Sequence, residues 1–592
     1  MKNRKKLFLP IAIMLLFAIG ILLRFIGIDW DQNHHLHPDE RAISMFVGGL
    51  NFPNSWAQFF SPDSPLNPKF FAYGSFPIYL LFFLARIPGM IFSNLAFLGS
   101  YDGAALFGRV VMGIVDVGII GMVFLVGKKF FSKKVGIIAA LFSTFTVLQI
   151  QLAHFYAFDP LLTLFILLTL YFAYDIAKKP SWKPVILTGI FLGLAFGTKI
   201  SVAPILLAIA LAFTIPYFMS KRTKRNNPSP PSVIPAKAGI HPRFYKLSAI
   251  SYKLITLLLI AFAVFAITNP YALIDFNRFI AGINEQSNMA RGIADFPFTR
   301  QYIGSIPYLY QIQNSILWGY GIPLGLLAWF GLGYGIYAFF KRKEFRLPII
   351  LILAWIIPYF GITGAFHAKF LRYMLPIMPF LTILGAFALV ELFTRLKFKK
   401  TIAAIGLIIF ASSILYAGAF ATIYFRLHSR VQASSWIYKN IPNGSVILTE
   451  HWDDDLPLGI VENNETKTID NHQYKIEKLN IWEVDDEKKV EHIATQLSKS
   501  DYLIFTSNRG YAPILRLAKR YPITNKAYNL LFEGKLGYEL VNTTTSYPNL
   551  LGWQINDDKS DESFTVYDHP KVLIFKNFGE FSKDTYNSLL SK

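Results

Sequence analysis

The sequence predicts a polytopic α-helical membrane protein with a C-terminal α/β domain, and three observations lead to this fold class. Of the 592 residues, 53% are hydrophobic and only 16% are charged, whereas soluble domains are about a quarter charged. Apolar stretches long enough to cross a bilayer recur through the first 424 residues. Residues 1–424 hold 38 basic and 14 acidic residues, and residues 425–592 hold 20 and 23. We therefore predict a transmembrane domain over 1–424 and an α/β domain over 425–592.

The same numbers exclude several classes of protein. The net charge of +21 belongs to the membrane part of the chain, so it does not indicate nucleic-acid binding. The chain has no Cys, which excludes disulfides, zinc–thiolate sites, iron–sulfur clusters and cysteine nucleophiles.

Basic clusters set the predicted topology. They lie at residues 2–6, 128–134, 178–183, 221–246, 341–346 and 395–400. The positive-inside rule makes these clusters cytoplasmic. The apolar segments between them are residues 7–28, 104–127, 135–152, 161–177, 254–268, 316–340, 347–362, 374–393 and 402–424. The N-terminus is then cytoplasmic and the C-terminal domain is extracytoplasmic, in a multi-pass protein of the cell's inner (plasma) membrane.

The same rule assigns two stretches whose topology is otherwise ambiguous. Between residues 183 and 221 the chain must go out and return, which predicts two short spans broken at residues 198–201 with Lys199 at the outer face. Residues 76–97 are apolar, yet a crossing there would put residues 128–134 outside. We predict a juxtamembrane or re-entrant helix pair in this first outer loop, broken near Pro88-Gly89, and about eleven spans in total.

The tail has the pattern of a small α/β domain. Residues 445–449, 501–506 and 572–575 are short β-like runs, and residues 488–498 are amphipathic with helical spacing. The Pro-rich stretch 226–243 is predicted to be a cytoplasmic linker without a function of its own.

Acidic residues gather on the predicted outer side, which accounts for ten of the fourteen in the membrane domain. The densest cluster is residues 34–41, with Asp39 and Glu40 adjacent. A carboxylate beside a low-dielectric boundary and a second negative charge suits a general base. The alternative is a solvated loop whose Asp-Glu pair caps a helix beginning at Arg41. The neighbouring histidines, including His37, lack the i, i+4 spacing of a firm zinc signature, so no metal site is predicted.

A second acid and a few cations complete the candidate site. Asp159 precedes Pro160 at an outward junction, where it would also serve as a helix N-cap. Lys69, Lys199, Lys369 and Arg372 lie at breaks between apolar segments, where cations reach lipid phosphates. Tyr73 and Tyr373 either stack on a sugar or belong to the interfacial aromatic belt.

These features, in this order, resemble the polyprenyl-phosphate-dependent glycosyltransferases of the GT-C fold, specifically family 39, which includes protein mannosyltransferases and lipid A aminoarabinose transferases. The likeness covers roughly residues 5–400. Its motifs are Asp39-Glu40, Asn67-Pro-Lys69 with Tyr73, Pro77-Ile-Tyr79, Gly108-Arg109, residues 127–134, residues 154–159, residues 193–199 and residues 372–380.

The resemblance implies roles for individual residues. Asp39 takes the position of the catalytic acid–base residue, with Glu40 beside it, and Asp159 that of the second acid. The outer Lys and Arg residues would bind the lipid phosphate, and His37, Tyr73 and Tyr373 would line the substrate site. The family's Ala-Arg-Phe-Ala-Arg reads Ala-His-Phe-Tyr-Ala over 153–157, so His154 would substitute for an arginine.

The implied activity is inverting sugar transfer from a polyprenyl-phosphate donor to an extracytoplasmic protein, glycan or lipid. The expected partners are this donor, the acceptor and the lipid bilayer, with no nucleic acid. No cofactor is firmly implied, and a divalent cation is left open. The alternative is a transporter or flippase for a lipid-linked sugar. Few mid-span charges count against it, namely Arg24, Arg86 and Asp116.

Overall fold

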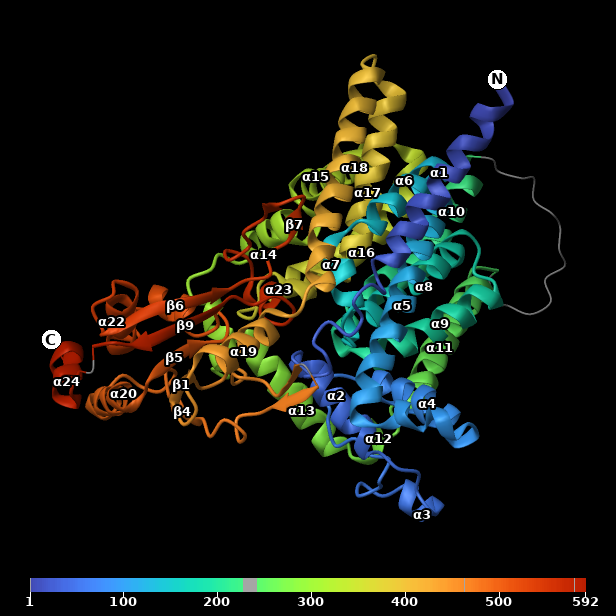
Figure 1. Cartoon of the computed structure of the whole chain (residues 1–592). Coiled ribbons are helices and arrows are strands. Elements are labelled where there is room, and N and C mark those ends of the chain that lie inside the picture. The colour runs from blue at the N-terminus through green and yellow to red at the C-terminus, as the bar shows by residue number, and fades with distance from the viewer. Residues whose placement is uncertain (1, 227–241, 463, 580, 592) are drawn as a thin grey trace. The chain divides into compact units, whose positions relative to one another are not determined.

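The computed structural model describes residues 2–226, 242–462, 464–579 and 581–591, and the chain forms two compact units (Figure 1). The first unit comprises residues 1–25, 39–288 and 307–417. The second comprises residues 26–38, 289–306 and 418–592. The C-terminal tail therefore folds together with two short segments that are far away in the sequence. The predicted linker at 226–243 lies almost entirely outside the described residues.

The part of the chain up to the last apolar helix is almost entirely helical. Its helices are α1 Lys2–Leu22, α2 Pro38–Gly49, α3 Trp56–Phe59, α4 Phe76–Ile91, η1 Ser93–Gly99, α5 Tyr101–Phe130, α6 Lys133–Thr144, α7 Val147–Ala153, α8 Phe158–Lys178, α9 Trp182–Thr198, η2 Ile200–Val202, α10 Ile205–Asn226, α11 Pro242–Thr268, α12 Tyr271–Ile274, α13 Phe276–Arg291, η3 Pro297–Tyr302, α14 Leu309–Asn314, η4 Ser315–Tyr320, α15 Ile322–Lys341, η5 Lys343–Phe345, α16 Arg346–Thr363, η6 Leu371–Met374, α17 Met378–Arg395 and α18 Lys399–Ala421.

Among the described residues, seven helices are long and apolar enough to cross a bilayer. An eighth span results if α6 and α7, bent by 60° at their break, cross together. The described apolar parts of α1, α4, α9 and α10 are shorter. The predicted polytopic helical membrane domain is confirmed, and the number of eleven spans stays a prediction.

The bend between α6 and α7 is stabilised by a buried charge. A break in a helix frees carbonyl groups, which water cannot reach inside a membrane domain. The Arg24 guanidinium donates to the carbonyl of Thr144 at 2.5 Å and, at 3.3 Å, to that of Ser143. It also pairs with Asp116 at 2.8 Å, and both side chains are at most 1% exposed. Arg24 and Asp116, two of the charges predicted to lie mid-span, thus neutralise each other. Arg24 also satisfies the carbonyl groups that the helix break leaves free.

The two stretches assigned by topology have different outcomes. The predicted break at residues 198–201 is confirmed, because α9 ends at Thr198 and a short 3-10 turn precedes α10. The helix pair predicted over residues 76–97 also forms, as α4 and η1, and its juxtamembrane or re-entrant placement stays a prediction. The predicted break near Pro88-Gly89 is wrong. Pro88 lies inside α4, and the chain turns extended at Phe92, whose φ is −124° and ψ 108°. Pro88 has no N–H to donate within the helix, yet the helix continues to Ile91 before the chain turns.

The second unit is built on a five-stranded sheet in the order β4-β1-β5-β9-β6. Strands β1, β4 and β5 are parallel, whereas β9 is antiparallel to β5 and β6, with Leu448 opposite Leu503 and Ile504 opposite Ile574. The elements are η7 Thr422–Phe425, α19 Ser429–Asn440, β1 Val446–Glu450, β2 Ile460–Glu462, β3 Glu465–Lys467, β4 Lys475–Leu479, α20 Glu487–Lys499, β5 Tyr502–Phe505, α21 Tyr511–Arg516, α22 Pro522–Phe532, β6 Tyr538–Thr544, β7 Asn549–Leu550, β8 Trp553–Gln554, α23 Glu562–Thr565, β9 Val572–Asn577 and α24 Lys583–Ser591.

Side chains of the central strands alternate between two cores. Leu448, Leu503 and Phe575 face a core with α20, α22 and α24, while Ile447 and Ile504 face one with α19. This period-2 pattern confirms the predicted strands at β1, β5 and β9 and the helix at α20. Strand β4 escaped prediction because its Lys-Ile-Glu-Lys-Leu sequence is charged, as is typical of an edge strand.

Candidate active site

The first unit brings together acids and cations from segments that are far apart in the sequence. Asp39 lies in the first turn of α2, Asp159 in that of α8, Lys199 directly follows α9, and Arg372 lies in η6. The charge pattern of the sequence places all four on one side of the membrane. Their contacts define one site.

Asp39 forms an ion pair with Arg372. The Asp39 side chain is 25% exposed and that of Arg372 13%, so the pair is open to a ligand at one edge. Arg372 also donates to the hydroxyl of Tyr73 at 3.5 Å. A guanidinium with several donors can hold a carboxylate and still turn others toward a phosphate.

Asp159 pairs with Lys199, whose ammonium is 3.0 Å from its carboxylate. The N-cap of α8 is Ala157, without a side-chain hydrogen bond, so the expected capping role of Asp159 is wrong. Asp159 lies one position inside the helix, where the positive end of the dipole still favours an anion. Its side chain is 4% exposed and that of Lys199 15%.

Aromatic rings enclose the ammonium of Lys199. It lies 4.8 Å from the ring centre of Tyr373 and 5.2 Å from that of Tyr73, within the range of cation–π attraction. The Tyr73 ring in turn contacts Phe158, at 4.4 Å between ring centres. Burial, followed by the negative charge of Asp39, raises the pKa of Tyr73 well above its ordinary value, so its hydroxyl keeps its proton.

Glu40 has a different environment from its neighbour Asp39. It is 0% exposed and accepts from Arg109 Nε at 3.0 and 3.1 Å and from Arg109 Nη2 at 2.5 Å. The backbone N–H of Tyr156 donates to it at 2.9 Å, and the Tyr156 hydroxyl donates to the carbonyl of Pro77 at 2.6 Å. The solvated-loop interpretation is therefore wrong for Glu40. This network joins α2, α5, α7–α8 and the start of α4.

Sequence reasoning noted Arg109 only as part of a motif and missed its role as the partner of Glu40. A lone arginine within a 30-residue apolar helix was the available signal, because such a charge requires a partner.

The other predicted site residues have partners of their own. Lys69 is about half exposed and pairs with Asp63 at 3.2 Å. Lys369 is 3% exposed and donates to the His367 carbonyl at 3.1 Å, and burial lowers its pKa. A ring nitrogen of His154, also buried, lies 2.8 Å from the Ile150 carbonyl. His37 belongs to the second unit, where its ring is 4.4 Å from that of Tyr567.

Within the described residues, no group of three or more His, Asp or Glu side chains has a geometry that could hold a metal ion.

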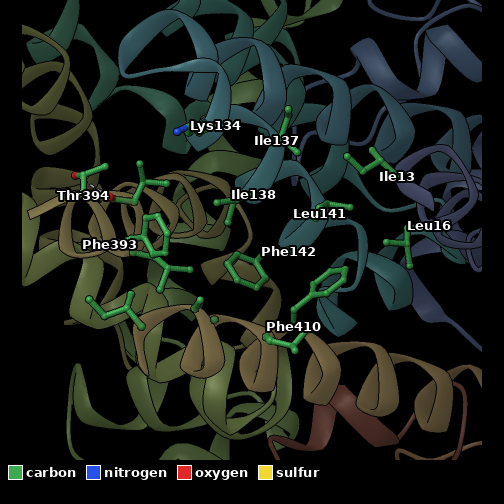
Figure 2. Close-up of a pocket in the computed structure, with 16 residues that line it drawn as sticks. Ile13, Leu16, Lys134, Ile137, Ile138, Leu141, Phe142, Phe393, Thr394 and Phe410 are labelled. Carbon is green, nitrogen blue, oxygen red and sulfur yellow. Dashed lines mark hydrogen bonds between the residues drawn. The ribbon is translucent and has the colours of Figure 1, made fainter. Parts of the chain in front are cut away.

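A separate cavity of about 640 Å³ lies within the first unit between α1, α6, α17 and α18. Figure 2 shows apolar side chains around it, among them Ile13, Phe142 and Phe410, with Lys134 at one edge. None of the residues of the polar site lines this cavity. Its lining suits hydrocarbon and offers no group for sugar transfer.

Comparisons with known proteins found one matching family model and several similar solved structures. Residues 80–230 match the family model described as dolichyl-phosphate-mannose-protein mannosyltransferase. This segment includes Arg109, Asp159 and Lys199. Over this segment, the match confirms the resemblance to glycosyltransferases of the GT-C fold that the sequence predicts. No curated protein matches the chain.

Several solved structures resemble it at low identity. The oligosaccharyltransferase AglB from Archaeoglobus fulgidus, in complex with an inhibitory peptide and a dolichol-phosphate, is 15% identical, with a TM-score of 0.47 over 88% of this chain and 72% of that one. The apo form of that organism's oligosaccharyltransferase is 16% identical, with a TM-score of 0.46 over 87% and 72%. ArnT from Cupriavidus metallidurans, bound to undecaprenyl phosphate, is 12% identical, with a TM-score of 0.39 over 95% and 97%.

Proposed function

We propose that this protein is an integral-membrane, inverting glycosyltransferase. It moves a sugar from a polyprenyl-phosphate donor to an extracytoplasmic acceptor, which is a protein, a glycan or a lipid. The family match over residues 80–230 names a lipid-phosphate sugar donor and supports this class of reaction. In this proposal the protein lies in the plasma membrane, with its N-terminus cytoplasmic and its C-terminal domain outside.

The observation that carries the proposal is the adjacency of two ion pairs, Asp39–Arg372 and Lys199–Asp159. Tyr73 touches both, since it accepts from Arg372 and its ring faces Lys199. Two cations at a membrane boundary suit a lipid phosphate, and the accessible carboxylate of Asp39 suits a proton acceptor. Asp159 and the rings of Tyr73 and Tyr373 hold the ammonium of Lys199 in place.

The proposed reaction is a single displacement at the anomeric carbon. The acceptor oxygen attacks this carbon, its proton goes to Asp39, and the bond to the phosphate oxygen breaks with its electron pair remaining on phosphate. The donor phosphodiester has one negative charge and the released phosphate monoester up to two. Protonation of Asp39 weakens its hold on Arg372 at that moment, which frees the guanidinium for the growing charge on phosphate. Attack opposite the phosphate inverts the anomeric configuration.

In this proposal Glu40 positions the site and does not react. Its carboxylate is buried against Arg109 and the Tyr156 amide, so no acceptor hydroxyl reaches it. It fixes the first turn of α2, and with it the direction of Asp39. Lys69, Lys369, His37 and His154 have no assigned step in the reaction.

The test is donor turnover by full-length protein in nanodiscs, with a synthetic polyprenyl-phosphate sugar and water as the acceptor. Release of polyprenyl phosphate is followed for the wild type, for Asp39→Asn and for Asp63→Asn. Asp63 is the matched control, an acid of the same outer region that is 87% exposed. We expect Asp39→Asn to lower turnover about 10²–10⁴-fold and Asp63→Asn to leave it unchanged.

Two results would contradict the proposal. Equal turnover by Asp39→Asn and wild type would remove Asp39 as the base. Failure of every donor to react, together with passage of lipid-linked sugar across proteoliposomes, would favour a flippase. Repeating the assay with EDTA and with added Mg²⁺ or Mn²⁺ tests the divalent cation.

A further inference from the structure

A small hairpin in the second unit displays two large apolar side chains to the surroundings. Strands β7 and β8 pair Leu550 with Trp553 and are joined by Leu551 and Gly552. Leu551 is 96% exposed and Trp553 83%. Exposing both in water forgoes the free energy of burying them. Among the residues whose exposure the structure describes, they are the only large apolar side chains above 80% exposure.

The turn itself is an unusual place for leucine. Leu551 has a φ of +51° and Gly552 a φ of +96°, as in the two-residue turns that favour Asn, Asp or Gly. The hairpin is held in shape by other groups: the Asn549 side chain accepts from the Gly552 amide at 2.9 Å, and Pro548 accepts from the Ile555 amide at 2.8 Å. A leucine is therefore present at a position whose backbone disfavours it and whose side chain is not packed.

The hairpin is fixed to the residues that leave the last apolar helix. Thr422, directly after α18, accepts from the Asn549 amide at 3.1 Å. Arg426 donates to the carbonyls of Tyr547 at 2.5 Å and Ser546 at 3.3 Å. The helix that starts at Lys399 is apolar enough to span a membrane, so Thr422 to Arg426 lie where the chain leaves the hydrocarbon core. Phe425 and Leu427 there are 66% and 53% exposed.

We propose that the β7–β8 hairpin inserts its tip into the lipid bilayer, in the leaflet where α18 ends. Leu551 enters the acyl-chain region, and Trp553 takes the interfacial position that tryptophan favours. Membrane insertion accounts for the apolar tip, for the leucine in the turn and for the anchoring to the end of a span. The hairpin then tethers the start of the C-terminal domain to the membrane surface at a second point besides α18.

The experiment uses the absence of cysteine from the chain. Leu551→Cys and, separately, Trp553→Cys are labelled with the fluorophore NBD in full-length protein reconstituted in nanodiscs. Val484→Cys is the matched control, an apolar residue of the same unit that is 80% exposed and lies outside the hairpin. Size-exclusion chromatography and circular dichroism check that each variant is folded.

We expect labels at 551 and 553 to emit at shorter wavelength than the label at 484 and to be strongly quenched by nitroxide-labelled phosphatidylcholine. The label at 484 should instead be quenched by water-soluble iodide. Labels at 551 and 553 that behave like the one at 484 would overturn the proposal and would favour a water-soluble partner for the hairpin. The readout does not depend on enzymatic activity, so it is independent of the proposed function.

Discussion

Two adjacent carboxylates, Asp39 and Glu40, take different roles because they point to different surroundings. The Asp39 side chain remains 25% exposed beside Arg372, while Glu40 is fully buried against Arg109. A buried charge requires a partner, and removing that partner leaves an unpaired ion in a low dielectric. Glu40 is thus important for stability, and Asp39 is available for chemistry.

Glu40→Gln is expected to destabilise the protein by about 3–5 kcal/mol, the usual cost of breaking a buried ion pair from one side. Asp39→Asn, at a partly exposed pair, should cost about 1 kcal/mol or less. Denaturant unfolding in detergent measures both. A Glu40→Gln variant that is as stable as wild type yet inactive would return Glu40 to a catalytic role.

Lys199→Met is expected to weaken binding of polyprenyl phosphate by about 1.5–3 kcal/mol, the usual contribution of a hydrogen bond to a charged group. Lys69→Met should leave the affinity unchanged, because Lys69 is about half exposed and paired with Asp63. Titration of polyprenyl phosphate into protein in nanodiscs gives both dissociation constants. Lys199→Arg, which keeps the positive charge, should restore part of the affinity. If Lys69→Met weakened binding and Lys199→Met did not, the phosphate site would instead lie in the first outer loop.

At the scale of the elements, a contact between main chains joins the parts of the site. The Gly74 amide donates to the Thr198 carbonyl at 3.0 Å, and the Ser75 amide donates to Asn269 at 2.6 Å. These bonds fix the loop that carries Tyr73 against the end of α9, which Lys199 follows. A Cβ atom on Gly74 would overlap the carbonyl of Gly197, so only glycine permits this approach.

Gly74→Ala is therefore expected to lower donor turnover at least tenfold, because the loop must move and take Tyr73 away from Lys199. Gly121→Ala is the matched control, since a Cβ there meets no atom within 4 Å and the change favours a helix. Comparing turnover of the two variants tests this prediction. Unchanged turnover in Gly74→Ala would show that the contact between Gly74 and the end of α9 does not determine the geometry of the site.

At the scale of the whole molecule, the second unit contains buried ionisable groups that make its stability depend on pH. Burial raises the pKa of Glu450 to about 8, and its carboxyl group is bonded to the Tyr528 hydroxyl. His569 lies between Asp568 and Asp557, at 2.5 and 2.9 Å. Burial lowers the pKa of His569, but the two carboxylates outweigh this effect and raise the pKa to about 10.

Stability should fall as the pH rises from about 4.5 to 8. In this range the folded state keeps a proton on Glu450 that the unfolded chain, with an ordinary pKa of 4.5, has lost. The folded state then binds more protons, and the free energy of unfolding decreases with pH. Glu450→Gln, which cannot ionise, should flatten this dependence, while His569 still gives a decline toward pH 10 in both proteins. Thermal unfolding of the wild type and of Glu450→Gln at pH 5, 6.5 and 8 tests this prediction. The same change of stability with pH in both proteins would contradict it.

Sequence patterns alone were enough to predict the membrane class, the break before Lys199, the strands β1, β5 and β9, and the family resemblance. These depend on local composition and period, because about 20 apolar residues or a few alternating ones are enough to define a span or a strand. The sequence also placed Asp39, Asp159, Lys199 and Arg372 on one side of the membrane, since Lys and Arg clusters decide orientation.

Which of these charges meet could be seen only in the folded protein. In the fold, Asp39 pairs with Arg372, 333 positions away in the sequence, and Glu40 pairs with Arg109. The fold also joins residues 26–38 and 289–306 to the C-terminal unit. The local sequence shows that a charge such as Arg109 in an apolar helix needs a partner, but the identity of that partner depends on packing between distant segments.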